Sequence, residues 1–202
     1  MTAHKYDIKA ETKKIIFQYT IVAMASLLIG GCFSYLISNG ILLTFGEEIK
    51  NHFLLEIKPD RQLDSILIYT AYYSLFDLLC VFLGFCFTFS IFNYLASDII
   101  LLCKGFSVGF STAVFYRCVS QYSVTDYRSL IIFAILKIFT LIFITVFLCG
   151  LSIHSVQLKI FLPNYRFKLE IKSLLFIILY TICGVGTAFI LNAIYCFLIF
   201  IL

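Results

Sequence analysis

An almost uninterrupted apolar stretch between residues 66 and 116 constrains this sequence more than any other feature. As one helix its 51 residues would be about 76 Å long, at roughly 1.5 Å per residue. A membrane span needs only about 20 apolar residues, so the stretch predicts two spans that fold back on each other. The polar residues Asn93, Ser97 and Asp98 mark the best place for the turn between them.

The composition agrees with a membrane protein. Of the 202 residues, 62% are hydrophobic and 13% are charged, whereas roughly a quarter are charged in a typical soluble domain. The mean hydropathy is +1.03. A soluble domain of this size cannot bury so much apolar surface, which excludes soluble enzymes, disordered chains and nucleic-acid-binding proteins.

Three further apolar runs add three spans, the first of which is expected to end at the breaker Asn39-Gly40. The predicted fold is all-α: a single integral membrane domain over residues 1–202, built as a polytopic bundle of about five transmembrane helices. The spans are expected at about residues 15–38, 66–91, 97–116, 130–151 and 173–202.

Two polar segments separate the spans. In residues 41–64, charged and apolar side chains alternate at helical spacing, which indicates an amphipathic helix at the membrane surface. Its candidate partner surface consists of Glu47, Glu48, Lys50, Phe53 and Glu56. Residues 152–172 are expected to form a basic loop. From Tyr165 to Lys172 apolar and charged residues alternate with a period of two, which favours an extended segment at the membrane interface. A helix that begins at the surface is the alternative.

Basic residues predict the orientation of the chain. Eight lie on the side of the N-terminus, at Lys5, Lys9, Lys13, Lys14, Lys159, Arg166, Lys168 and Lys172. Five lie on the other side, at Lys50, Lys58, Arg61, Arg117 and Arg128. The positive-inside rule then predicts a multi-pass protein of the cell membrane with a cytoplasmic N-terminus and an outer C-terminus.

Small residues at a spacing of about four predict where helices pack, because they let backbones approach closely in lipid. Three spans carry such stripes: Ser26, Gly30, Ser34 and Ser38; Gly105 and Gly109, beside Lys104; and Thr181, Gly184, Ala188 and Asn192. We therefore expect the first, third and fifth spans to form the packed centre and the second and fourth to face lipid.

Three charged residues fall inside spans: Asp77, Lys104 and Lys137. An unpaired charge at mid-membrane costs about 2.5–3.5 kcal/mol, so an ion pair is the economical arrangement. The candidate pair is Asp77 with Lys137, and Lys104 is the alternative partner. Both lysines could instead extend toward the interface.

Most known catalytic and ligand-binding motifs do not occur in the sequence. It has no HExxH, P-loop or dinucleotide fingerprint, and no Cys or His at metal-ligand spacing. Gly105-Phe106-Ser107-Val108-Gly109 matches the letters of GxSxG, but no histidine lies near the serines of the spans, because His4, His52 and His154 lie outside the spans or at their edges. We therefore expect no catalytic residue, no cofactor and no metal. A small transporter or permease subunit that uses Asp77 and Lys137 is the alternative function, although five spans cannot divide into equal inverted repeats.

The segment Lys104-Gly105-Phe106-Ser107-Val108-Gly109-Phe110 resembles the Lys-Gly-x-x-x-Gly-Phe motif of the stage II sporulation protein M family. The length of the chain and the order of its spans and polar segments are also similar to that family. Asn192 stands where the family usually has Glu, no Pro follows it, and the family's Pro-Gln-Asn turn before the fourth span is absent. These departures indicate a divergent member.

The resemblance implies a non-enzymatic membrane scaffold. Proteins of this family bring stage II sporulation proteins D and P, which remodel peptidoglycan, to the septum during engulfment. By the same resemblance, Lys104, Gly105 and Gly109 have a role in helix packing. The expected partners are membrane lipid and these proteins; nucleic acid is not expected, and self-association stays open.

Overall fold

The structure is a computed structural model that describes residues 8–37, 41, 44, 63–90, 92–121, 127–161 and 171–201. Its helices are α1 (Ile8–Ser34), α3 (Leu63–Thr88), α4 (Asn93–Gln121), α5 (Tyr127–Phe161) and α6 (Ile171–Ile201). Each contains a stretch long and apolar enough to cross a membrane: Ala10–Ser34, Thr70–Thr88, Asn93–Arg117, Ile131–Ser155 and Leu174–Leu198. The predicted all-α bundle of five spans is confirmed for the described part of the chain.

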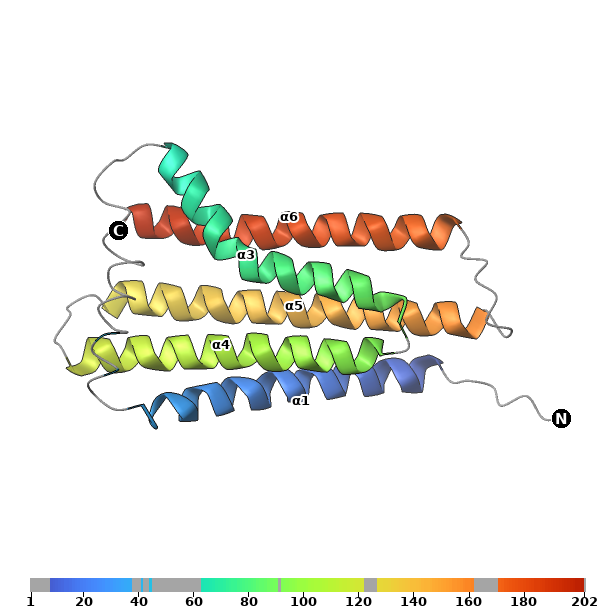
Figure 1. The fold of residues 1–202 in the computed structure, drawn as a ribbon, viewed down its shortest axis with the longest axis horizontal. Coiled ribbons are helices and arrows are strands. Elements are labelled where there is room, and N and C mark those ends of the chain that lie inside the picture. The colour runs from blue at the N-terminus through green and yellow to red at the C-terminus, as the bar shows by residue number, and fades with distance from the viewer. Residues whose placement is uncertain are drawn as a thin grey trace.

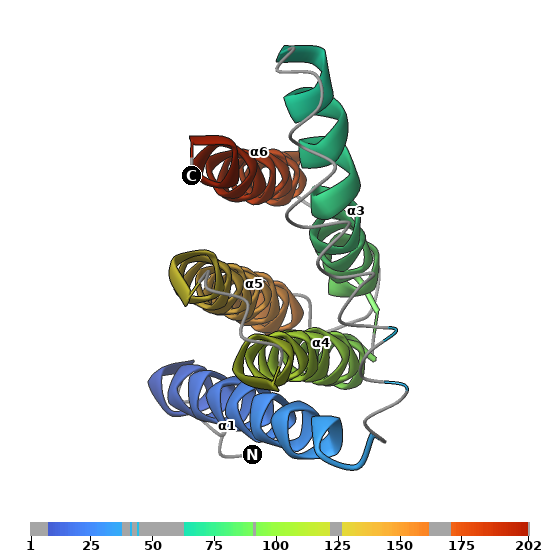
Figure 2. The same cartoon turned by 90° about the vertical axis from the view of Figure 1, so that its left-hand side faces the viewer.

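The helices run roughly side by side, with the start of α1 and the end of α6 at opposite ends of the bundle (Figure 1). Seen along the bundle, α4 and α5 lie between α1 on one side and the pair α3 and α6 on the other (Figure 2). Accordingly α5 contacts every other helix, and α4 contacts α1, α3 and α5. The first half of α3 diverges from the bundle direction and crosses α6 obliquely (Figure 1).

The prediction of which helices form the centre is wrong for three of the five spans. The fifth span, in α6, has only 17% of its residues buried. The second and fourth spans, in α3 and α5, each have 33% buried, which is more than the 28% of the first span, in α1; the third span, in α4, has 44%. Ile144, Leu148 and Leu151 of α5 are fully buried in the main apolar cluster. Because leucine and isoleucine suit lipid and a neighbouring helix equally well, an apolar surface does not reveal which face is buried.

The turn between the second and third spans comes earlier than predicted. Helix α3 ends at Thr88 and α4 begins at Asn93, so Ser97 and Asp98 lie inside α4. In the connection, the Ser90 hydroxyl accepts a 3.1 Å hydrogen bond from the Phe92 backbone N–H. The polar residues after it do not mark a turn, because they contact neighbouring helices inside the bundle.

Other predicted boundaries also move. Helix α1 ends at Ser34, before the Asn39-Gly40 pair, which lies outside the described residues. Helix α5 continues to Phe161, so residues 152–161 are helix and not loop. Residues 162–170 and the candidate partner surface lie outside the described residues: Glu47, Glu48, Lys50, Phe53 and Glu56.

Candidate functional site

The closest helix contact in the described bundle involves three glycines, Gly30 on α1 and Gly105 and Gly109 on α4, which we call the α1–α4 seam. A Cβ atom added at Gly30 would lie 2.9 Å from the Cα of Phe106, and one at Gly109 would lie 2.9 Å from the carbonyl carbon of Leu27. Real Cβ atoms do not approach backbone that closely. The glycines therefore set the distance between α1 and α4.

Polar groups on α1 bond to α4 along the same seam. The buried Ser26 hydroxyl lies 2.9 Å from the Ala23 carbonyl of its own helix and 3.3 Å from the Leu101 carbonyl of α4, and it donates to both. Near the other end of the contact, Arg117 donates to the carbonyl of Ser34, one of the last carbonyls of α1. These bonds satisfy polar groups that lipid cannot.

The remaining two residues predicted for packing, Gly184 and Ala188, lie on α6, and Gly184 faces α5. A Cβ atom at Gly184 would lie 2.9 Å from Cδ2 of the Phe147 ring, and Ala188 is buried. The neighbour at Gly184 is a side chain and not backbone. Packing here is therefore more adaptable than at the seam.

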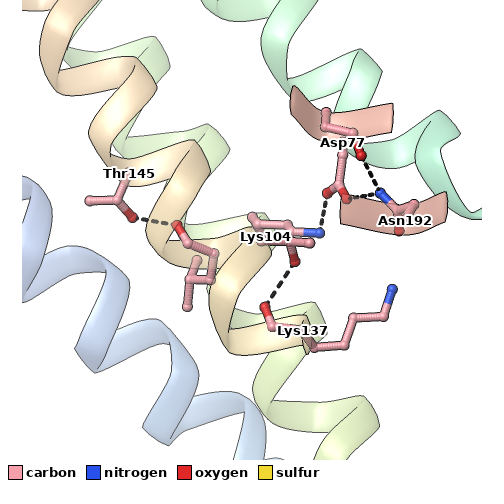
Figure 3. Close-up of polar contacts among 8 residues, drawn as sticks. Asp77, Lys104, Lys137, Thr145 and Asn192 are labelled. Carbon is pink, nitrogen blue, oxygen red and sulfur yellow. Dashed lines mark hydrogen bonds and ion pairs between the residues drawn. The ribbon is translucent and has the colours of Figure 1, made fainter. Parts of the chain in front are cut away.

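The three residues Asp77, Lys104 and Asn192 form the polar centre of the bundle, where α3, α4 and α6 meet (Figure 3). The Lys104 ammonium group donates to Oδ1 of Asp77, with which it forms an ion pair. The Asn192 amide donates to Oδ2 of Asp77 over 2.9 Å and to the Ala188 carbonyl over 2.9 Å. All three side chains are buried, so both carboxylate oxygens have a donor inside the protein.

Of the two candidate partners of Asp77, the structure places Lys104 in the ion pair and Lys137 outside it. No dashed line reaches the Lys137 ammonium group in Figure 3. Its Nζ lies 5.8 Å from the ring centroid of Phe133 and 5.7 Å from that of Tyr195. Both distances are within the range of a cation–π interaction. Among the described residues, no carboxylate forms an ion pair with Lys137.

A pocket of about 380 Å³ lies beside the polar centre, between α3, α4 and α5. We call it the lysine pocket. Its lining includes Tyr72, Phe76, Lys104, Ser107, Ser111 and Lys137, and the described residues that line it include no Asp or Glu. Its volume falls within the range of about 300–1,000 Å³ that is typical of small-molecule sites.

A second polar group joins α1, α4 and α5 in the other half of the bundle. Tyr19 and Ser152 share a 2.7 Å hydrogen bond between their hydroxyls, and the Asn93 amide donates to the same Ser152 oxygen over 3.3 Å. The Gln18 amide donates to Oδ2 of Asp98 over 2.6 Å. Asp98 and Asn93, which the sequence assigned to a turn, thus fix α4 to its neighbours.

Nothing in the sequence distinguishes Tyr19 or Ser152, because a single tyrosine or serine in an apolar span has no distinctive spacing. The spacing of four between Asn93 and Ser97 could have placed them on one helix face. Asn192 was assigned to packing, although its position in an apolar span already required a polar partner.

Comparisons with protein-family models, with curated proteins and with solved structures find no match to this chain. What the sequence and structure define is therefore a class: an integral, multi-pass membrane protein of the all-α type.

Proposed function

We propose that this protein is a non-enzymatic membrane scaffold, in which the bundle holds the polar segments between its helices at the membrane surface for protein partners. The observation that carries the proposal is that the residues of the polar centre bond to one another. Asp77, Lys104 and Asn192 bond to one another across three helices and are buried. These groups act as a cross-link between helices.

The α1–α4 seam supports the same function. Backbones in close contact at Gly30 and Gly109 leave little freedom for one helix to move past the other. Together with the cross-link, the seam favours a rigid bundle. A rigid bundle is suited to presenting surface segments in a fixed arrangement.

The resemblance around Lys104, Gly105 and Gly109 supplies the partner class. We propose that the partners are proteins that remodel peptidoglycan during sporulation engulfment, such as stage II sporulation proteins D and P. The segment around Glu47 to Glu56 is the candidate surface for them, since it is amphipathic and carries both signs of charge.

A small transporter or permease subunit is the second candidate function. It is favoured by the lysine pocket, where Lys137 faces a space beside the buried Asp77–Lys104 pair. A transport site would use the charge state of Asp77 directly, whereas a scaffold would use Asp77 only for stability. The two functions therefore predict different effects of the same substitutions.

Copurification from native membranes distinguishes them. In one variant a neutral Gly/Ser linker replaces residues 47–64, and in a matched control the same type of linker replaces residues 122–126. The scaffold function predicts that wall-remodelling proteins copurify with the wild type, the loop control and Asp77→Asn, and are lost from the 47–64 variant. Recovery of an ATPase subunit, or loss of substrate uptake in Asp77→Asn with partner binding unchanged, would contradict it.

A further inference from the structure

We propose that the lysine pocket binds the acidic head group of an amphiphile from the membrane. The head group is a carboxylate or phosphate oxyanion, and it carries an apolar tail. This inference concerns the pocket alone and does not depend on the scaffold function. Three properties of the pocket carry it, namely its charge, its opening and its depth.

The charge of the lining favours an anion. Two ammonium groups, those of Lys104 and Lys137, face the pocket, and the described lining residues include no carboxylate. Lys104 is already paired with Asp77. Lys137 lies over the faces of two aromatic rings and forms no ion pair with a described residue, so its positive charge has no anionic partner there. An anion in the pocket would supply one.

The opening of the pocket favours a ligand that arrives from lipid. Tyr72 and Leu75, which line one side, are 69% and 67% exposed on the outer surface of a membrane-spanning helix. Ser107 is exposed on α4. A pocket with such walls opens sideways between helices, and the walls suit an acyl chain.

The depth of the pocket places the oxyanion. Lys137 lies six residues after the start of the span Ile131–Ser155, and Ser111 lies six residues before the end of the span Asn93–Arg117. Consecutive antiparallel spans put those two ends at the same membrane face, so both residues lie about 9 Å below it. The Ser111 hydroxyl and the Lys137 ammonium group therefore stand at one level, within reach of an acidic head just below the interface. The pocket continues to Lys104, near mid-membrane, and the tail would leave the pocket toward lipid along Tyr72 and Leu75.

Photo-crosslinking tests the proposal with the full chain in phosphatidylcholine nanodiscs. The probes are diazirine-labelled palmitate, which carries a carboxylate, and diazirine-labelled phosphatidylglycerol, which carries a phosphodiester. Diazirine-labelled phosphatidylcholine with the same chains is the neutral control. We expect at least one acidic probe to label peptides that contain Tyr72 or Phe76 more strongly than the control. Labelling by palmitate only assigns a carboxylate ligand, and labelling by phosphatidylglycerol assigns a phosphate.

Variants separate a pocket site from general attraction to charge. Lys137→Gln should reduce acidic labelling roughly tenfold, since a hydrogen bond to a charged group is lost, and Lys137→Arg should retain it. Lys13→Gln removes an exposed cation on α1 and should leave labelling unchanged. Ser107→Phe fills the pocket from an exposed position without changing any lysine and should abolish labelling.

The proposal is overturned if the acidic probes label the pocket no better than phosphatidylcholine. It is equally overturned if Lys137→Gln and Ser107→Phe both label like the wild type. Size-exclusion profiles of each variant show whether it is folded, and the Ser107→Phe result decides the question should Lys137→Gln fail to fold.

Discussion

Asn192 donates a 2.9 Å hydrogen bond to Oδ2 of Asp77, across 115 residues of sequence. The other carboxylate oxygen accepts from Lys104, so one acidic side chain joins α3 to both α4 and α6. Lipid supplies no donor for a carboxylate, and the three residues are therefore interdependent. Removing any one of them leaves a buried polar group without its partner.

Asp77→Asn should destabilise the bundle by about 3 kcal/mol, because it leaves the buried Lys104 cation without a counter-charge. The measurement is the free energy of unfolding by steric trapping in mixed micelles. The double variant Asp77→Asn/Lys104→Met should recover most of that loss, since the polar centre then holds no unpaired charge. Lys137→Met is the matched control, because that lysine lies outside the ion pair, and it should change stability by less than about 1 kcal/mol. Equal losses in Lys137→Met and Asp77→Asn would show that the pairing is wrong.

Asn192→Leu should cost about 1 kcal/mol, which is the usual size of an interhelical hydrogen bond in a membrane protein. The loss is smaller than for Asp77→Asn because the ion pair survives. In Asp77→Asn, the further change Asn192→Leu should cost less than it does in the wild type, and a double-mutant cycle measures this coupling. Strict additivity would contradict the shared contact.

Gly109→Ala should destabilise the bundle by about 1–3 kcal/mol, because the new methyl group meets the backbone of Leu27 and α1 must move away. Gly31→Ala provides a matched control on the same contact. A Cβ atom there meets nothing within 4 Å, so this change should be neutral or stabilise the helix by up to about 1 kcal/mol. The prediction fails if the two variants unfold at the same free energy.

Tyr19→Phe should cost about 1 kcal/mol, because it breaks the buried hydrogen bond to Ser152. Ser152→Ala breaks the same bond and also removes the acceptor of the Asn93 amide, so it should cost at least as much. Combined, the two changes should cost less than the sum of the single losses, since the bond can be removed only once. Tyr116→Phe is the control, because Tyr116 is 52% exposed. A loss in the control as large as that in Tyr19→Phe would refute a specific role for the Tyr19 hydroxyl.

The sequence predicts the spans well because each is a long apolar run with polar ends, and the membrane itself sets the required length. It also identifies Asp77, Lys104 and Lys137 as the unusual residues, since charge inside a span is costly. The glycine spacing of Gly105 and Gly109 indicates an interface in the same way. These are local features of single helices.

The sequence does not predict features that depend on the rotation of each helix about its axis or on which helices are neighbours. Lys104 and Lys137 both had suitable positions to pair with Asp77, and only the arrangement of α3 beside α4 and α6 decides between them. The spans are apolar on all sides, so their hydrophobicity does not point to a buried face. For the same reason the exposed position of α6 and the inward direction of Asn93 and Ser97 could not be foreseen.

The ion pair also bears on how the chain enters the membrane. Asp77 and Lys104 are separated by only 27 residues and lie on consecutive spans joined by a short connection. When α3 leaves the translocation machinery alone, its carboxylate faces a cost of about 2.5–3.5 kcal/mol. Insertion of α3 and α4 as one hairpin cancels that cost before the rest of the chain is made. Helix α6, synthesised after the other four described helices, then joins a charge-neutral acceptor through Asn192. The least buried span, Leu174–Leu198, can therefore dock without a charged residue of its own.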